Sequence, residues 1–205
     1  MTKANVEDFM LMTGEAGSSS KLVKNVEQIE SYIYHFNEEM YDVGQYQELI
    51  DSILTCPEET HYTFMFSCCG GSVEAAIAIV NAMNMSGGTF TGVLTTQASS
   101  AATIVLLACD QVSVMPDSYM MLHAVSYGVG GKMGDVKASS GFIQRTSEKL
   151  LKDTYKHFLT SSEIDMLIDG KDYWMDSDEV VDRLNKRAEL FNSGDKEDVP
   201  SGLMN

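Results

Sequence analysis

The strongest constraint on the fold is an alternation of strand and helix patterns in the middle of the chain. The segment 61–67 is typical of a buried strand and leads into two glycines, and 73–85 is apolar over a wide arc, as in a buried helix. A strand at 89–95 and a very hydrophobic helix at 99–109 repeat the same order. This alternation predicts an α/β layer fold with a largely parallel sheet.

The flanking segments complete this organisation. We divide the chain into a flexible arm over residues 1–25, one folded domain over 26–192 and a disordered tail over 193–205. The remaining strands are expected at 31–36, 111–115 and 119–123, and further helices at 46–54 and, long and polar, at 135–159. Two more helices should follow. Ser161 or Ser162 caps the first of them, and Asp176 or Ser177 caps the second.

The charge and the cysteine content exclude several classes of partner and compartment. Acidic residues outnumber basic residues by 30 to 14, which gives a net charge of −16. Such a surface repels phosphates and anionic lipids, so we expect no nucleic-acid partner and no membrane partner. The chain opens with no basic and apolar leader, and its apolar runs are too short to span a bilayer. Four cysteines without zinc-type spacing predict free, mostly buried thiols, no metal and a cytoplasmic location.

A glycine pair marks the first place where the residue pattern suggests chemistry. Gly70 and Gly71 lie where a predicted strand turns into a helix. Glycines let the backbone approach a ligand closely, and the N-terminus of the following helix aims N–H groups at negative charge. A tetrahedral oxyanion needs such fixed donors. The alternative is that the pair simply makes a turn.

A serine and a histidine form the second and third such places. Ser100 is expected in the first turn of an apolar helix, among small residues that leave room for a substrate. Alternatively, Ser99 or Ser100 only caps that helix. His123 ends an apolar strand, where it is either a structural residue or a base that takes the serine proton and later returns it. A carboxylate would have to orient the imidazole, and the pattern alone cannot choose among the acidic residues.

Four segments then resemble the landmarks of a known family, in the same order along the chain. They are Gly70-Gly71-Ser72, Gln97-Ala98-Ser99-Ser100, Met120-Met121-Leu122-His123 and Lys171-Asp172-Tyr173-Trp174. This series is similar to that of the Clp proteolytic subunit (ClpP) family, over roughly residues 25–190. The 29 positions from Gly71 to Ser100 and the 49 from His123 to Asp172 also agree with that family.

The resemblance implies a role for each matching residue. Ser100 resembles the nucleophile, His123 the general base and then acid, and Asp172 the orienting carboxylate. The backbone N–H groups of Gly71 and Ala101 would form the oxyanion hole. We expect Trp174, close to Asp172, to pack in the core rather than to contact the substrate.

The same resemblance implies a fold and an assembly. The family fold is a crotonase-like α/β spiral of β-α units with a protruding handle helix, and a glycine-rich segment such as 126–134 pairs with extended substrate. The subunits form a homo-oligomer, a heptamer or a double heptamer, that cleaves unfolded polypeptides. A separate hexameric AAA+ unfoldase uses ATP, whereas this chain has no P-loop, and we expect it to need no cofactor. The expected location is cytoplasmic, with an organelle stroma or an infected host cytoplasm as alternatives.

Two other functions compete with a Clp-type serine endopeptidase. The first is an assembly subunit of a mixed Clp-type ring with little activity alone. The second is a crotonase-like enzyme that processes acyl-CoA, since such enzymes share the fold and also use backbone N–H donors. Those enzymes rely on acidic residues without a serine–histidine pair, so Ser100 and His123 argue against the second alternative.

Overall fold

A six-stranded sheet organises the computed structural model, which describes residues 30–192. The predicted arm over 1–25 and tail over 193–205 lie outside these residues. The elements in chain order are β1 (Ser31–Phe36), η1 (Gly44–Tyr46), α2 (Gln47–Thr55), β2 (His61–Cys68), α3 (Val73–Met85), β3 (Thr89–Ser99), α4 (Ala101–Ala108), β4 (Gln111–Val114), β5 (Tyr119–Leu122), α5 (Met133–Tyr155), α6 (Ser161–Ile168), β6 (Tyr173–Asp176) and α7 (Ser177–Asn192).

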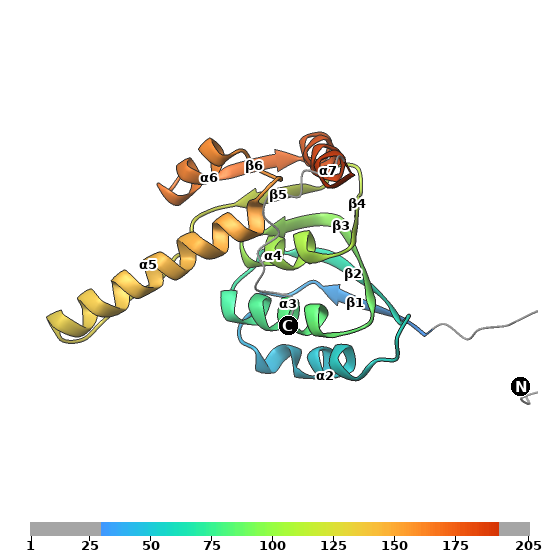
Figure 1. Cartoon of the computed structure of the whole chain (residues 1–205), viewed down its shortest axis with the longest axis horizontal. Helices are drawn as coiled ribbons and strands as arrows, with labels where there is room; N and C mark the ends of the chain where they lie inside the picture. The colour runs from blue at the N-terminus through green and yellow to red at the C-terminus, as the bar shows by residue number, and fades with distance from the viewer. Residues whose placement is uncertain (1–29, 193–205) are drawn as a thin grey trace, which may run out of the picture.

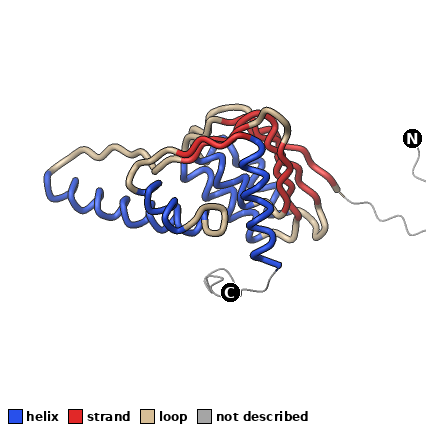
Figure 2. The backbone as a smooth tube through the Cα atoms, turned by 90° about the horizontal axis from the view of Figure 1, so that it is seen from above, coloured by secondary structure: helices blue, strands red, loops and turns tan. Residues whose placement is uncertain are grey.

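The sheet is parallel except at one edge. Its strands follow the order β1-β2-β3-β5-β6, and β4 pairs with β3 beside this path. All pairings among β1 to β5 are parallel, whereas β6 runs antiparallel to β5. Helices α2, α3 and α4 return the chain between the parallel strands and lie on one side of the sheet (Figures 1 and 2). The predicted mixed α/β class with a largely parallel sheet is therefore confirmed.

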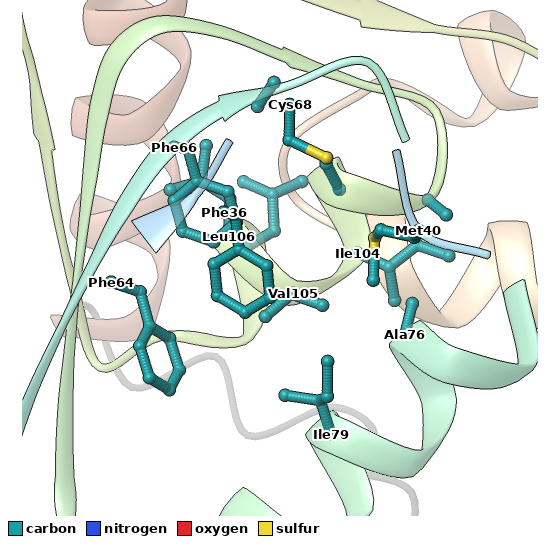
Figure 3. Packing of buried hydrophobic residues seen from close by; sticks show 14 of the residues in the cluster. Phe36, Met40, Phe64, Phe66, Cys68, Ala76, Ile79, Ile104, Val105 and Leu106 are labelled. Atoms are coloured by element: carbon teal, nitrogen blue, oxygen red, sulfur yellow. The ribbon is translucent and has the colours of Figure 1, made fainter. Parts of the chain in front are cut away.

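The core lies between the sheet and these helices. Alternate residues of β2 are buried, including Phe64 and Phe66, because successive strand side chains point to opposite faces. The ring of Phe36 on β1 stacks on that of Phe66, with 4.8 Å between the ring centres. Ile79 of α3 and Val105 of α4 cover these rings from the helix side (Figure 3). Burying these side chains removes apolar surface from water, which is the main driving force for folding.

Helix α5 departs from this compact layer. It extends away from the body over most of its length (Figure 1), and its fully buried residues, Leu151 and Tyr155, lie near its C-terminal end. Packing therefore anchors the helix at that end. A protruding helix of this kind was expected here, and its use as a handle between rings remains a prediction.

Several local expectations are wrong. Strand β3 continues to Ser99 instead of ending at 95, so α4 begins only at Ala101. Thr160, not Ser161 or Ser162, caps α6, because its hydroxyl accepts from the Glu163 N–H at 3.2 Å. The expected core residue Trp174 is 66% exposed. Within residues 30–192, no helix combines the length and hydropathy needed to cross a bilayer.

Candidate active site

Ser100 occupies a strained turn between a strand and a helix. Strand β3 ends at Ser99 and α4 begins at Ala101, and between them Ser100 has φ 53° and ψ −128°. Few L-residues adopt a positive φ, and such residues concentrate at functional sites. Gly70 makes the turn sterically feasible, because a Cβ at this position would lie 2.7 Å from Ser100 Cβ and 2.4 Å from the carbonyl oxygen of Ser99.

The turn brings the Ser100 hydroxyl to His123. The Oγ atom of Ser100 lies 2.7 Å from Nε2 of His123, within hydrogen-bond distance. The backbone sets this contact, because β3 pairs with β5 up to Ser99 and Met121, and the Ser100 N–H then donates to Met121 O at 2.8 Å. Ser100 makes no side-chain cap to α4, so its hydroxyl is directed at the imidazole instead. The alternative that Ser100 only caps the helix is therefore wrong.

Asp172, the expected third member of the site, makes no hydrogen bond to this pair. Leu122 is opposite Tyr173 in the antiparallel pairing of β5 and β6, and continuing that register by one residue sets His123 opposite Asp172. The Asp172 side chain is exposed, and within residues 30–192 it has no hydrogen bond or ion pair. The fold thus brings Ser100 and His123 into contact and leaves Asp172 unbonded, just before β6.

Two backbone N–H groups near Ser100 are available as donors. Ala101 is the first residue of α4, where an N–H has no partner within its helix. The turn at Gly71 is fixed by Met40, whose N–H donates to Gly70 O at 2.9 Å and whose carbonyl accepts from Ser72 N at 2.6 Å. Gly71 has φ 137°, and a Cβ there would lie 2.2 Å from Met40 O, so only glycine fits. Gly71 and Ala101 are the two residues expected to donate to an oxyanion, and their use as donors remains a prediction.

A pocket of about 340 Å³ joins these groups. Its lining includes the four residues discussed above, Ser100, His123, Gly71 and Ala101. Its other walls are mostly apolar and include Val73, Ile104, Met121, Val125 and Leu151. Such a pocket can hold an apolar side chain beside the serine and exclude water from the reacting atoms.

Two further residues at this site were not expected from the sequence. Thr103 and Tyr155 are buried beneath Ser100, and their hydroxyl oxygens lie 2.7 Å apart. Burial raises the pKa of the Tyr155 phenol to about 12. Thr103 is the only hydroxyl residue inside the apolar helix α4, which is a weak signal, whereas Tyr155 ends a polar helix and gave none.

The cysteines follow the expected burial only in part. All four cysteines are free, as expected, but only Cys68 is buried. Cys56 and Cys109 are half-buried, and Cys69 is exposed and lines the pocket, so the expectation of mostly buried thiols holds only in part. Cys69 has this position because it alternates with Cys68 at the end of β2, where side chains point to opposite sides. Among residues 30–192, no group of three or more His, Cys, Asp or Glu side chains is arranged to hold a metal ion.

Comparisons with known proteins agree on one family. The Clp protease family model matches residues 19–183. The ATP-dependent Clp protease proteolytic subunit of Bacteroides fragilis is 29% identical over 113 residues, which cover 54% of this chain and 55% of that protein. The subunit of the same name from Bacteroides thetaiotaomicron is 28% identical over 113 residues, or 54% of this chain and 51% of that protein. The chain thus spans about half the length of these relatives. Because the family match covers most of its sequence, this chain belongs to the Clp protease family.

Proposed function

We propose that this chain is a serine endopeptidase subunit in which Ser100 is the nucleophile and His123 the general base. The observation that carries the proposal is the 2.7 Å contact between Ser100 Oγ and His123 Nε2. A serine hydroxyl is a weak nucleophile by itself and needs an adjacent base to take its proton. The strained turn at Ser100 and the neighbouring donors at Gly71 and Ala101 support this assignment.

These groups account for both halves of peptide cleavage. As Ser100 Oγ attacks the scissile carbonyl carbon, the hydroxyl proton moves to His123 Nε2 and the carbonyl oxygen becomes an oxyanion. The N–H groups of Gly71 and Ala101 donate to that oxyanion. His123 then gives the proton to the leaving amine, and the C–N bond breaks to leave an ester on Ser100. Water, deprotonated by the same imidazole, then attacks the ester. The bond between the acyl carbon and Ser100 Oγ breaks, His123 returns the proton to Oγ, and the carboxylic acid is released.

Asp172 is the proposed orienting carboxylate. The β5–β6 register supports this role, because its continuation by one residue would pair His123 with Asp172. We propose that a side-chain rearrangement then brings the carboxylate to the imidazole. A carboxylate there would hold the ring in one tautomer and stabilise the imidazolium that forms during attack.

We further propose that the subunit works in a homo-oligomeric ring, a heptamer or a double heptamer, on unfolded polypeptides in the cytoplasm. The matched relatives are called proteolytic subunits of an ATP-dependent protease, which supports a separate ATP-using unfoldase as partner. Helix α5 is the proposed handle between rings, because it reaches away from the body and exposes Met133 and Phe142 along its length.

The test compares two neighbouring serines. Ser100→Ala should lower kcat for a fluorogenic peptide and for an unfolded protein by at least about a thousandfold, as loss of a nucleophile does elsewhere. Ser99→Ala, the matched control, removes a hydroxyl one residue away and should keep activity close to that of the wild type. A folded Ser100→Ala protein that still cleaves these substrates would rule out the proposed nucleophile.

One observation favours a second function, an assembly subunit with little activity alone. Asp172 is not bonded to His123 in the described part of the chain, so the catalytic group is incomplete as it stands. This function predicts no cleavage by the purified chain, and recovery of cleavage when a second Clp-type proteolytic subunit is mixed in. If the purified chain cleaves peptides by itself, this alternative is excluded.

A further inference from the structure

A buried chain of hydrogen bonds runs from the end of α5 to the peptide group that follows the nucleophile. The carbonyl oxygen of Ser100 accepts from Thr103 twice, from its backbone N–H at 3.0 Å and from its Oγ1 hydroxyl at 2.6 Å. The same Thr103 Oγ1 lies 2.7 Å from the hydroxyl of Tyr155. Thr103 is fully buried and Tyr155 is 1% exposed, so water does not compete for these bonds.

The number of protons on each hydroxyl fixes the direction of these hydrogen bonds. The Thr103 hydroxyl has a single proton, which it donates to the Ser100 carbonyl. The Tyr155 hydroxyl is therefore the donor to Thr103 Oγ1. Because burial raises the pKa of Tyr155 to about 12, the phenol keeps its proton throughout the neutral range. The order of donation is Tyr155 to Thr103 to Ser100.

The clamped carbonyl belongs to the same peptide group as the Ala101 N–H. A trans peptide is planar, and its C=O and N–H point in opposite directions. Two bonds that fix the Ser100 oxygen on the α4 side therefore also fix the direction of the Ala101 N–H on the other side. Ala101 is one of the residues that line the catalytic pocket. Accepting two bonds also polarises the amide, which strengthens its N–H as a donor.

This peptide needs such a clamp because its backbone is strained. Ser100 has φ 53° and ψ −128°, a conformation that persists only where the surroundings over-determine it. At φ 53° the Ser100 Oγ reaches His123, so relaxation of the turn would move both the nucleophile and the neighbouring donor.

We propose that Thr103 and Tyr155 are positioning residues that hold the Ser100–Ala101 peptide so that the Ala101 N–H meets the oxyanion. The inference rests on the proposed peptidase function and adds two residues to it. Tyr155 is among the residues that line the substrate pocket, but its hydroxyl is engaged by Thr103. Removing that hydroxyl should therefore weaken transition-state binding and leave the binding of ground-state peptide intact.

The test uses substitutions that keep shape and remove one hydroxyl. Tyr155→Phe and Thr103→Val should each lower kcat about tenfold, with KM within about twofold of wild type, because one oxyanion donor is worth about a hundredfold or more when lost outright. The affinity for a peptidyl boronate, whose serine adduct is tetrahedral, should fall by a similar factor, and that for a product peptide should not. Thr103→Ser keeps the hydroxyl and should restore most of the activity.

Two further measurements separate positioning from general stability. The double variant Tyr155→Phe with Thr103→Val should be no slower than Thr103→Val alone, since the tyrosine acts through the threonine. Tyr62→Phe is the matched control, because Tyr62 is also buried and its hydroxyl bonds to Ser52, far from the site. It should lower Tm by a similar amount and leave kcat unchanged.

The possible outcomes separate the positioning role of Thr103 and Tyr155 from the peptidase function itself. If the wild type cleaves peptides and folded Tyr155→Phe matches it in kcat and boronate affinity, the inference is wrong and the peptidase function stands. A loss of kcat in Tyr62→Phe equal to that in Tyr155→Phe would also overturn it. If the wild type neither cleaves peptides nor binds the boronate, the proposed function fails and the inference falls with it.

Discussion

At the scale of single residues, the site depends on glycines that admit a strained serine. Gly70 has φ 92° and contacts the turn that carries Ser100. A side chain there would collide with backbone atoms, which cannot move aside as the end of a flexible side chain can. The nucleophile and its glycine neighbour therefore form one structural unit.

Replacing this glycine should affect stability and activity together. Gly70→Ala should lower the free energy of unfolding by about 2 kcal/mol or more, because the new Cβ meets both a disfavoured φ and the Ser99 carbonyl. It should also abolish peptide cleavage. Gly134→Ala, where nothing lies within 4 Å, is the control and should not lower the free energy of unfolding. Equal denaturation midpoints for the two variants would contradict this account of the turn.

The orienting role of Asp172 has its own test. Asp172→Asn keeps the size of the side chain and removes its charge, and it should lower kcat by about a hundredfold or more because imidazolium loses its stabilising partner. The nearby exposed Asp169 gives the control variant Asp169→Asn, which should retain activity. If both variants cleave peptides at the same rate, Asp172 does not orient His123.

Sequence reasoning located the contacting pair but not what lies beneath it. Ser100 and His123 follow adjacent parallel strands, so their meeting could be predicted from motifs that end those strands. The contribution of Tyr155 could not be predicted, because it lies 52 positions from Thr103 and depends on how α5 docks. A single tyrosine in a polar helix has no local pattern that reveals such a long-range contact.

At the scale of elements, an ion pair joins α6 to α7. Arg183 of α7 donates to both carboxylate oxygens of Glu163, at 2.8 and 3.1 Å, and these side chains are about four-fifths buried. The Arg183 guanidinium, helped by bonds from Thr160, lowers the Glu163 pKa from its ordinary value of 4.5 to about 2. The same carboxylate completes the capping box at the start of α6.

This ion pair predicts a pH-dependent stability. A carboxyl whose pKa is lowered on folding stabilises the protein above its unfolded value near 4.5 and loses that contribution as the pH falls toward about 2. Glu163→Gln should therefore cost about 1–2 kcal/mol at neutral pH and progressively less below pH 4.5. Chemical denaturation of both proteins from pH 7 to pH 3 measures the difference.

An exposed ion pair provides the control for that series. Lys149 and Asp153 pair at 2.6 Å on α5 with exposed side chains. Asp153→Asn should change stability by less than about 0.5 kcal/mol, because solvent screens such pairs. A difference between wild type and Glu163→Gln that stays constant down to pH 3 would contradict the assigned pairing.

Element boundaries were predictable where local chemistry sets them. Helix α3 begins and ends where expected, at Val73 and Met85. Its start is set by Ser72, whose hydroxyl accepts from the Ala75 N–H as an N-cap. Strand β6 was missed, because four residues at a sheet edge have no clear period and form a strand only by pairing with β5. Pairing with β5 likewise extends β3 to Ser99.

At the scale of the whole molecule, residues 30–192 expose several large apolar side chains. Helices cover one face of the sheet, whereas parallel sheets in proteins are usually covered on both. Met133 is 89% exposed on the protruding helix, Met85 is 77% exposed at the end of α3, and Ile33 is 67% exposed on the edge strand β1. Contact with other copies would bury such residues, which supports the proposed ring.

The native mass tests the ring directly. In dilute buffer, native mass spectrometry should give seven or fourteen times the chain mass of 22.6 kDa. Met133→Lys, at the exposed end of α5, should reduce a double ring to a single ring if this helix joins two rings. A chain that remains monomeric at tens of micromolar would contradict the assembly, although it would not affect the assignment of Ser100.

The central claim is that His123 activates Ser100 as a nucleophile, and covalent labelling tests it most directly. The wild type would be treated with a fluorophosphonate, and the intact mass and the modified peptide would be determined by mass spectrometry. We predict one adduct per chain, located on Ser100, slowed strongly in His123→Ala and absent in Ser100→Ala, with Ser99→Ala labelled as the wild type is. A folded, assembled wild type that acquires no adduct, or acquires it on another residue, would contradict the claim.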